Sequence, residues 1–367
     1  MTRLQVSVDY GAIARNVERL RAHAPTAQLM AVVKADAYGH GLVEAARAAR
    51  DGGAAWLGVA QPDEALALRA AGDTGRILTW LYGPDVPARA LVAAGVDVSA
   101  SSLEVLARLI EDARAEGVRA RVHVCVDTGL AREGVRPEGL GALLDAAREA
   151  DDAVAVVGLW SHLAWADQPG HPTIDAQAAV FREALAVAEA RGVALEVRHL
   201  ANSAATLTRP DLHFDLVRPG IAVYGLPPVE DPAGASFSLE PAMRVTASLA
   251  LVKDVPAGQG VSYGHDYTTP RATRLGLVTA GYADGVFRSA GNRADVAVGG
   301  RRHRIAGRVC MDQVVLDLGP DAPEQAGDMV VFIGPDGPSA RDWAEAVGTI
   351  DYEIVCRFGG LKEKRQA

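Results

Sequence analysis

The stretch AVVKADAYGHG, residues 31–41, is the part of the sequence from which the fold can be worked out. An apolar run of the kind that forms a buried strand ends in one lysine, Lys34, and a glycine-punctuated turn follows. A lysine at the end of a buried strand loses hydration, which favours the neutral amine that can attack a carbonyl carbon. The alternative is a lysine that ends a strand and extends its ammonium group into water. The surrounding sequence decides between these two interpretations.

Eight apolar runs of strand length recur along the first 220 residues, and most are separated by alanine-rich amphipathic stretches typical of helices. The runs are 29–34, 56–60, 76–80, 96–100, 121–127, 154–161, 196–200 and 215–218. Parallel strands need crossover helices, and closing the sheet removes its edges, so the pattern predicts an α/β fold, a (β/α)8 TIM-type barrel. A doubly wound open sheet is the alternative, but no GxGxxG sequence follows the first strand.

The composition changes after about residue 228. A Pro-, Gly- and Ser-rich segment, PPVEDPAGASFSLEPAM (227–243), has the character of a linker. The β-rich segments beyond it are separated by Gly or Pro turns, with one late helix in SARDWAEAVG (339–348). We therefore expect two domains, a barrel over 1–230 and a mostly antiparallel β domain over 231–367.

Charge and hydropathy exclude several classes of protein. The net charge is −9 and the mean hydropathy is +0.07, and the densest basic cluster (301–304) follows a Gly-Gly turn, so we expect no nucleic-acid partner. The amino terminus lacks the apolar core of a signal peptide and no apolar run reaches membrane-spanning length, which predicts a cytoplasmic protein without a membrane partner. Three cysteines without CxxC spacing give no sign of a metal site.

The unusual polar residues follow the carboxyl ends of predicted barrel strands, where barrel enzymes build their active sites. They are Lys34, Tyr38, Arg132, His162, Asn202, Ser203 and Arg218. Each alone has a structural explanation, such as a surface cation, a hydrogen-bonded histidine or a helix cap. Together they would have to select one face of the barrel by chance.

Two loops of this face suggest a phosphate site. Loops after the seventh and eighth strands of such barrels often bind phosphate through backbone N–H groups, and here they carry Ser203 with the amides of Gly220 and Ile221. A phosphate at this place, with a Schiff-base lysine opposite it, implies pyridoxal 5'-phosphate as the cofactor.

Nine motifs along nearly the whole chain resemble those of the alanine racemases, barrel-type (fold type III) pyridoxal-phosphate enzymes. They are AVVKADAYGHG, VDTGLAR, SHLAWAD, ANSAA, RPGIAVYG, VSYG (261–264), GYADG (281–285), GRVCMDQ (307–313) and DYE (351–353). The resemblance implies an isomerase that interconverts L-alanine and D-alanine and supplies D-alanine for peptidoglycan. It also implies a homodimer with active sites shared between subunits.

The resemblance assigns the proton transfers to two residues. Lys34 would bind the cofactor covalently and then remove or return the α-proton on one face of the substrate. Tyr263, from the other subunit, would act on the opposite face, because inversion requires a base on one side and an acid on the other. Without the resemblance, a tyrosine in a β turn is more simply a packing aromatic.

The remaining roles follow from the same resemblance. Arg218 would face the pyridine nitrogen and, being permanently charged, keep it unprotonated. His162 would support Arg218 or stack near the ring. Tyr38, Tyr352, Asn202, Ser203, Gly220 and Ile221 would bind the phosphate end of the cofactor. Arg132 and the Met311 amide would hold the substrate carboxylate, and Tyr282 and Asp312 would narrow the entrance from the partner chain.

The sequence departs from the family pattern at Cys125. Many relatives carry there a carbamylated lysine whose negative charge orients the substrate-binding arginine, so a bound anion or neighbouring residues must orient Arg132 instead. The tail CRFGGLKEKRQA (356–367) also differs from the usual ending, which puts contacts at the carboxyl terminus in doubt.

Three other functions stay open. A broad-specificity racemase acting on serine would share much of the framework, because a small pocket discriminates weakly against one added hydroxyl. A non-catalytic pyridoxal-phosphate protein would stop after the barrel. A basic amino-acid decarboxylase would lack the VSYG, GYADG and CMDQ set.

Overall fold

The structure is a computed structural model that describes residues 4–83, 85–229, 236–360 and 364–366. The chain forms two compact units. One comprises Gly11–Ala37 and Leu42–Glu240, and the other comprises Met1–Tyr10, Tyr38–Gly41 and Pro241–Ala367. The amino-terminal residues therefore group with the carboxyl-terminal unit. The domain boundary expected between 230 and 231 lies outside the described residues.

The first unit is a closed parallel barrel, as the sequence predicts. Its eight strands are β2 (Gln28–Val32), β3 (Trp56–Val59), β4 (Arg76–Thr79), β5 (Asp97–Ala100), β6 (Ala120–Cys125), β7 (Val154–Trp160), β8 (Val197–His199) and β9 (Leu216–Val217). The order is β8-β7-β6-β5-β4-β3-β2-β9 and every neighbouring pair is parallel. A parallel bridge between Asn202 and Arg218 closes the ring, with the Arg218 amide 2.9 Å from the Ala201 carbonyl oxygen.

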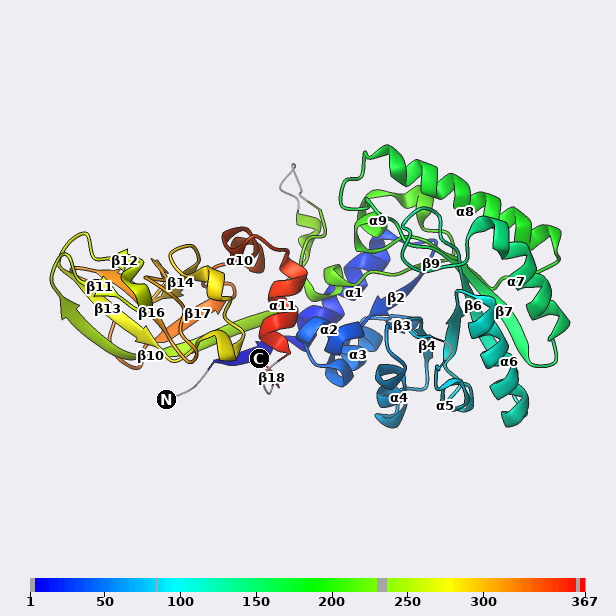
Figure 1. Ribbon diagram of the computed structural model, residues 1–367, viewed down its shortest axis with the longest axis horizontal. Helices are drawn as coiled ribbons and strands as arrows, with labels where there is room; N and C mark the ends of the chain where they lie inside the picture. The colour runs from blue at the N-terminus through cyan, green and yellow to red at the C-terminus, as the bar shows by residue number, and fades with distance from the viewer. Residues whose placement is uncertain (1–3, 84, 230–235, 361–363, 367) are drawn as a thin grey trace. The chain divides into compact units, whose positions relative to one another are not determined.

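Helices lie outside the strands (Figure 1). They are α1 (Tyr10–His23), α3 (Leu42–Asp51), α4 (Pro62–Ala70), α5 (Ala88–Ala93), α6 (Leu103–Glu116), α7 (Pro137–Glu149) and α8 (Pro172–Ala190), followed by the short α9 (Ser203–Thr208) and the 3₁₀ turns η1 (Pro210–Leu212) and η2 (Ile221–Tyr224). Helix α6 shows how the sequence sets these bounds. The Ser102 side chain accepts a hydrogen bond from the Val105 amide, and Gly117 ends the helix at φ 65°.

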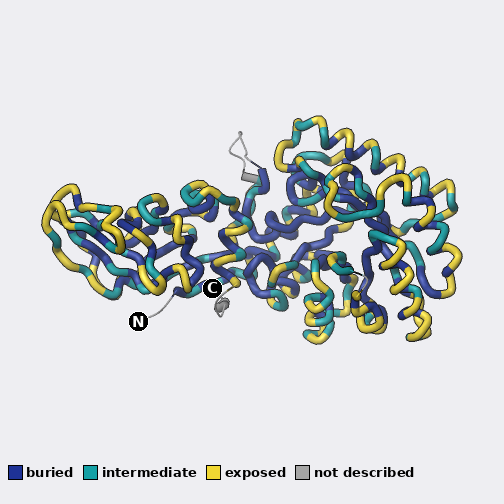
Figure 2. The backbone as a smooth tube through the Cα atoms, in the orientation of Figure 1, coloured by how far each residue is buried: buried dark blue, intermediate teal, exposed yellow. Residues whose placement is uncertain are grey.

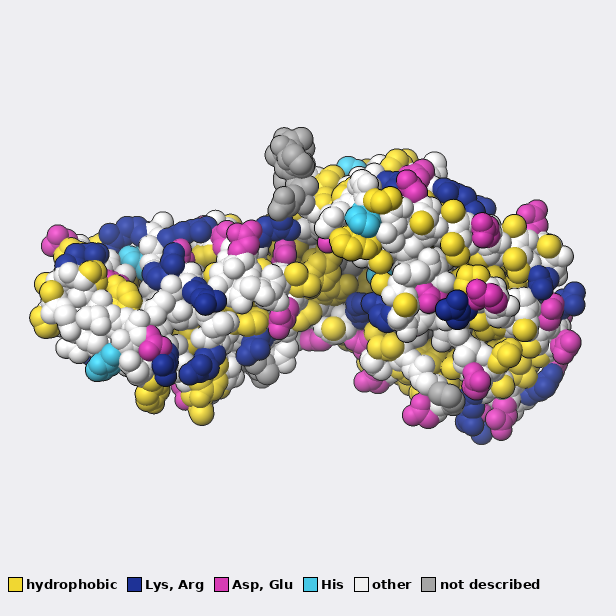
Figure 3. Space-filling model, turned by 45° about the horizontal axis from the view of Figure 1, so that its top comes forward, with side chains coloured by type: hydrophobic (Ala, Val, Ile, Leu, Met, Phe, Trp, Pro, Cys, Tyr) yellow, Lys and Arg dark blue, Asp and Glu magenta, His cyan; other side chains and the backbone are white. Residues whose placement is uncertain are grey.

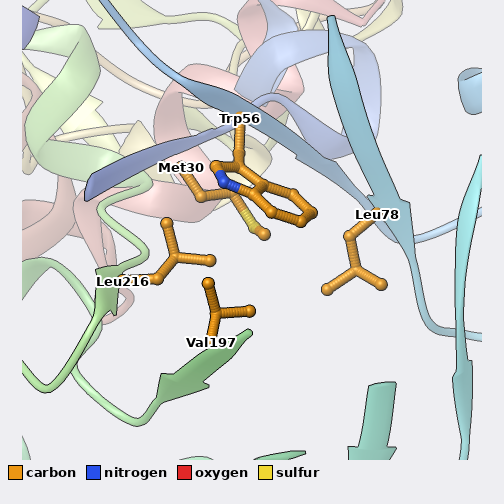
Figure 4. Packing of buried hydrophobic residues seen from close by; sticks show 5 residues of the cluster. All are labelled: Met30, Trp56, Leu78, Val197 and Leu216. Atoms are coloured by element: carbon orange, nitrogen blue, oxygen red, sulfur yellow. The ribbon is translucent and has the colours of Figure 1, made fainter. Parts of the chain in front are cut away.

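The barrel interior is filled by side chains from strands that are distant in sequence. Figure 4 shows five buried residues that meet there: Met30, Trp56, Leu78, Val197 and Leu216. Burying an apolar side chain of this size contributes about 1.5–3 kcal/mol, so the cluster stabilises the closure of the ring. Figure 2 shows that the strands are buried along the chain, whereas the helices are exposed on their outer faces.

The second unit is built on one long, bent strand. β10 (Met243–Val255) pairs with β1 (Gln5–Val8) and β17 (Met329–Ile333) through its first part and with β13 (Thr273–Val278) through its last part. The other strands are β11 (Gly260–Val261), β12 (Tyr267–Thr268), β14 (Asp295–Val298), β15 (Arg301–Arg304), β16 (Val314–Gly319) and β18 (Lys364–Gln366). Among the described residues of this unit, all the strand pairs are antiparallel except β1 with β18, so the second unit has the predicted mostly antiparallel character.

Two helices complete this unit, α10 (Ala340–Val347) and α11 (Asp351–Gly359), together with the 3₁₀ turns η4 (Tyr263–His265), η5 (Tyr282–Asp284) and η6 (Arg288–Ala290). The turn η3 (Ser236–Ser238) belongs to the first unit. Three aromatic residues, Phe332, Trp343 and Phe358, pack the helices on β17, with ring centroids 5.7–6.2 Å apart. This packing fixes α11, which carries Tyr352.

The surface of each unit mixes charges of both signs, as the face drawn in Figure 3 shows. Within the described part of the chain, no helix combines the length and the apolar character needed to cross a membrane.

Candidate active site

The segment after β2 is a left-handed helical turn. Here α2 (Lys34–Gly39) begins at the predicted lysine, and four successive residues other than glycine have positive φ: Ala35 at 55°, Asp36 at 53°, Ala37 at 56° and Tyr38 at 54°. The left-handed conformation costs L-residues about 1–2 kcal/mol each. Such strain persists only where the surroundings fix the backbone, and it is concentrated at functional sites.

Hydrogen bonds to Asp36 hold this turn. Its carboxylate Oδ1 accepts from the Leu42 amide at 2.7 Å, and its own amide lies 3.3 Å from Glu64 Oε1. The Ala37 amide also donates to the Val33 carbonyl oxygen at 2.9 Å. The backbone of Lys34 is thus fixed, and its half-buried side chain places Nζ 6.0 Å from the centre of the Trp80 ring.

Arg218 lies at the end of β9 and is only 6% exposed. Its Nη2 donates to the Ser161 carbonyl oxygen at 2.8 Å and lies 3.4 Å from His162 Nδ1. Its guanidinium carbon is 5.1 Å from the centre of the Trp160 ring. Burial lowers the pKa of Arg218 to about 10, so the guanidinium remains cationic at neutral pH.

A chain of buried hydrogen bonds extends from Arg218 through the barrel interior. Arg218 Nη1 lies 3.3 Å from His199 Nδ1, His199 Nε2 lies 2.9 Å from His123 Nδ1, and His123 Nε2 lies 3.3 Å from Asp97 Oδ2. A guanidinium has no acceptor, so His199 Nδ1 must accept and its proton lies on Nε2. The same argument puts the His123 proton on Nε2, where it is donated to the Asp97 carboxylate.

His162 is also held neutral. Burial lowers its pKa to about 3, and the positive charges of Arg218, Arg132 and Lys34 add to this shift. Its Nδ1 can therefore accept from Arg218. Arg218, Arg132 and Lys34 therefore all lie near His162, although the four residues follow four different strands.

The loops after β8 and β9 meet at Ser203. Its buried Oγ accepts from the Gly220 amide at 2.8 Å and from the Ala222 amide at 3.4 Å. Asn202 caps α9 through Oδ1, which accepts from the Ala205 amide at 3.1 Å. The predicted phosphate residues of these loops, including Ile221 at the start of η2, are thus adjacent in space.

Arg132 has an acidic partner that the sequence did not single out. Its guanidinium forms two hydrogen bonds with the Glu133 carboxylate, the one from Nη2 to Oε1 being 2.8 Å long. Cys125, at the end of β6, is 2% exposed, and burial raises the pKa of its thiol. The position where the sequence resemblance leads us to expect a negative charge therefore holds a neutral thiol.

Tyr38 and Tyr352 both belong to the second unit, where their ring centres are 6.0 Å apart. The close approach depends on two glycines. A Cβ on Gly39, which has φ 80°, would lie 2.7 Å from the Val355 carbonyl oxygen, and one on Gly359 would lie 2.0 Å from the Gly39 oxygen. Burial raises the pKa of Tyr38, and Tyr352 adds to the shift, so the Tyr38 phenol stays protonated.

Three loops of the second unit are joined by hydrogen bonds to backbone carbonyl oxygens. Ser262 Oγ, in VSYG, donates to the Arg308 carbonyl oxygen at 2.7 Å. The Tyr282 amide, in GYADG, donates to the Cys310 carbonyl oxygen at 3.0 Å, and the next amide along donates to the Met311 carbonyl oxygen at 2.9 Å. The motifs VSYG, GYADG and GRVCMDQ, separate in sequence, therefore form one surface.

The side chains on this surface are exposed in the chain by itself. Tyr263 is 72% exposed, Met311 55% and Tyr282 36%, and Asp312 beside them is also exposed. A buried packing role for Tyr263, the simpler alternative from sequence, does not fit this exposure.

The predicted residues thus form two sets. One lies in the barrel unit: Lys34, Arg132, His162, Asn202, Ser203, Arg218, Gly220 and Ile221. The other lies in the second unit: Tyr38, Tyr263, Tyr282, Met311, Asp312 and Tyr352. Sequence reasoning missed Glu133 and the supports of Arg218, namely Asp97, His123, Trp160 and His199. A polar residue inside an apolar strand, such as His123 in β6, was the available signal. Among the described residues, no group of three His, Cys, Asp or Glu side chains is arranged to hold a metal ion.

Comparison with known proteins matches both units. The family model described as alanine racemase, N-terminal domain, covers residues 8–228, and the one described as alanine racemase, C-terminal domain, covers 242–365. An alanine racemase of Salinispora tropica is 55% identical over 100% of this chain and 98% of its own length, and one of Streptomyces coelicolor is 54% identical over 97% and 94%. The crystal structure of alanine racemase from a D-cycloserine-producing Streptomyces lavendulae superposes with a TM-score of 0.96 at 51% identity, covering 100% of this chain and 97% of that one. The chain therefore belongs to the alanine racemase family of isomerases.

Proposed function

We propose that this chain interconverts L-alanine and D-alanine with pyridoxal 5'-phosphate, and that Lys34 and Tyr263 move the α-proton on opposite faces of the substrate. The observation that supports this best is the set of chemical groups that follow the carboxyl ends of the barrel strands. An amine, a buried guanidinium and a hydroxyl that bridges two backbone amides arise from three different strands.

The residues of this end fit the proposed cofactor. Among the described residues, Arg218 Nε has no hydrogen-bond acceptor, although both Nη atoms of the same buried side chain do. That N–H can donate to the ring nitrogen. Ser203 Oγ and the first amides of α9 and η2 offer donors for the phosphate, with Asn202, Gly220, Ile221, Tyr38 and Tyr352 as its other ligands. When bound, pyridoxal phosphate would supply a carbonyl carbon for the amino group and a ring that withdraws electrons from the Cα–H bond.

Lys34 and Tyr263 carry the proton in this proposal. Lys34 Nζ takes or returns the α-proton on one face, and the Tyr263 hydroxyl does so on the other. Inversion needs two groups because a single base would return the proton to the face it came from. The fixed backbone of α2 supports the role of Lys34, since proton transfer requires the amine to be positioned before reaction.

Arg218 sets the charge at the ring. Its guanidinium is cationic at neutral pH and would donate to the ring nitrogen of bound cofactor, which would keep that nitrogen unprotonated. The neutral His162 and His199 accept hydrogen bonds from Arg218 and add no second positive charge beside it. They hold the plane of the guanidinium, and they can do so only as neutral imidazoles.

The substrate is held at its carboxylate. Arg132 donates to it, with the Met311 amide as a second donor, because a guanidinium pairs with a carboxylate through two parallel hydrogen bonds. Tyr282 and Asp312 narrow the entrance. Their exposure, and that of Tyr263, supports a homodimer in which these residues serve the partner's site.

We further propose that the dimer acts in the cytoplasm and supplies D-alanine for peptidoglycan. The decisive experiment is to incubate the purified protein with pure L-alanine or D-alanine in deuterium oxide. Both should reach the same racemic mixture with deuterium at Cα. Protein that binds pyridoxal phosphate but exchanges neither enantiomer would refute the proposal. Parallel rates with serine and larger amino acids would measure the breadth of the pocket.

A further inference from the structure

Arg132 and Glu133 are adjacent in sequence but form a paired contact through two hydrogen bonds. Glu133 occupies the edge of the guanidinium made by Nε and Nη2. The carboxylate is the less accessible partner, with 20% of its side chain exposed against 58% for Arg132. The acid is therefore turned toward the protein and the base toward open space, unlike the usual arrangement of two solvated surface charges.

The loop that carries the pair is fixed at both ends. The Val135 amide donates to the Cys125 carbonyl oxygen at 2.8 Å, and the Asp127 amide donates to the Val135 carbonyl oxygen at 2.9 Å. Gly134 at φ 105° allows this approach, because a Cβ there would lie 2.6 Å from the Asp127 nitrogen. Ala131 is also held at φ 58°. A loop closed in this way presents the Arg132 side chain with little freedom of the backbone.

Other acids near Arg132 have different partners. The Asp127 carboxylate accepts from the amides of Gly129 and Ala131, both at 3.0 Å, and so serves the turn. The Cys125 thiol is neutral because burial raises its pKa, and the charge of Glu133 increases that shift. Glu133 thus acts electrostatically on the end of β6, where a negative charge is expected and the side chain cannot supply one.

We propose that the Glu133 carboxylate is the anion that orients Arg132 for the substrate, so that this chain needs neither a carbamylated lysine at position 125 nor a bound anion. The inference rests on the proposed function, in which Arg132 holds the carboxylate of alanine. Glu133 is a positioning residue, since it acts through Arg132 and does not touch the substrate.

The geometry of guanidinium explains how both roles coexist. Arginine has five N–H groups in a planar fork. Glu133 takes the edge formed by Nε and Nη2, which leaves the edge formed by Nη1 and Nη2 for a second carboxylate. Among the described residues, Arg132 Nη1 has no hydrogen-bond acceptor of its own. The Glu133 carboxylate fixes the plane of the Arg132 guanidinium, and the substrate carboxylate would bind at the other edge in the same plane.

The test compares three variants of the holoenzyme. Glu133→Gln keeps the size and removes the charge, Glu133→Asp keeps the charge, and Glu138→Gln is the matched control, since Glu138 pairs with the exposed Arg136 on the same stretch of chain. We expect Glu133→Gln to raise the KM for alanine roughly tenfold with kcat changed much less, because ground-state and transition-state binding of the carboxylate weaken together. Glu133→Asp should recover part of the loss, and Glu138→Gln should match the wild type.

Acetate binding provides a readout independent of turnover. Acetate carries the carboxylate alone, so its dissociation constant, measured by calorimetry, should rise in Glu133→Gln by a similar factor. Replacing chloride by methanesulfonate, which has no carboxylate to compete with alanine, at constant ionic strength should leave the wild-type KM unchanged. An unchanged or lowered KM in Glu133→Gln, or a wild-type KM that depends on chloride, would overturn the role of Glu133. A wild type that does not racemise alanine would instead refute the proposed function.

Discussion

Arg218 of the barrel unit differs from Tyr263 and Met311 of the second unit in how far the side chain is buried. In the barrel unit, Arg218 is 6% exposed and its contacts continue through two imidazoles to Asp97. In the second unit, backbone hydrogen bonds fix the loops, but Tyr263 is 72% exposed and Met311 is 55% exposed. The barrel set is organised by the fold of one chain. Tyr263 and Met311 of the other set lie on hydrogen-bonded loops but expose their side chains, which is the pattern expected of residues that complete a site in a partner subunit.

The largest effect should come from Lys34 in the barrel set. In the proposed function, Lys34→Ala removes the amine that would bind the cofactor and move one proton, so racemisation should fall by about a thousandfold or more. Lys253→Ala, which removes an exposed lysine of β10, is the control and should keep full activity. The assay is polarimetry from both enantiomers, with absorbance to follow cofactor binding. A Lys34→Ala protein that racemises at near wild-type rate would remove the barrel amine from the mechanism.

Tyr263 tests whether the second set serves a partner. Tyr263→Phe should lower racemisation from L-alanine and from D-alanine alike, because the proposed inversion needs a proton-carrying group on each face and the two enantiomers have equal free energies. Mixing it with Lys34→Ala should restore activity, since a heterodimer has one site in which both residues are intact. Random exchange of subunits predicts about a quarter of the wild-type specific activity.

The control for this mixture is each variant exchanged with itself. If the mixed sample is no more active than the sum of the two parents, both residues serve a site of the same chain. The contrast between the two sets would then reflect only local exposure.

The contact of Tyr38 with α11 should be sensitive to a single methyl group. Gly39→Ala places a Cβ 2.7 Å from a backbone oxygen at φ 80°, whereas Gly258→Ala has a similar φ of 78° and no atom within 4 Å. The control should cost about 1–2 kcal/mol for the left-handed conformation alone. Gly39→Ala should cost roughly 1–3 kcal/mol more, because backbone atoms must shift. Guanidinium unfolding measures both, and equal losses would show that the close approach contributes nothing.

The sequence was sufficient for the fold because its patterns are local. Eight apolar runs with helices between them were enough to place the strands of the barrel and, after them, Lys34, Arg132, His162 and Arg218. The left-handed turn at 35–38 could not be predicted, since Ala and Tyr have no preference for positive φ. Tertiary hydrogen bonds to Asp36 impose it.

The supports of the site were also beyond the sequence. His123 and His199 lie 76 residues apart and meet only when β6 and β8 take their places in the ring. Glu133 was visible beside Arg132, but whether neighbouring charges pair with each other or with solvent depends on the closed loop around them. Position after a strand can be predicted, whereas partners that come from other strands cannot.

The smallest effect concerns the charge state of the barrel set. His162 is neutral in the folded chain, with a pKa of about 3 against an ordinary value near 6.5, so the unfolded chain binds one more proton between these values. Its contribution to stability is complete above pH 6.5 and is lost as the pH falls toward 3. Between pH 7 and pH 5 this one group should lower the free energy of unfolding by about 2 kcal/mol.

The measurement therefore compares how steeply the free energy of unfolding falls with pH in the wild type and in two variants. His162→Gln cannot take up the proton, so in protein freed of cofactor its free energy of unfolding should fall by about 2 kcal/mol less than that of the wild type over the same pH range. His23→Gln, at an exposed position of α1, should follow the wild type. Parallel slopes for all three proteins would mean that His162 is protonated in the folded chain. Arg218 would then face a second cation instead of a hydrogen-bond acceptor, contrary to the contact with His162 Nδ1.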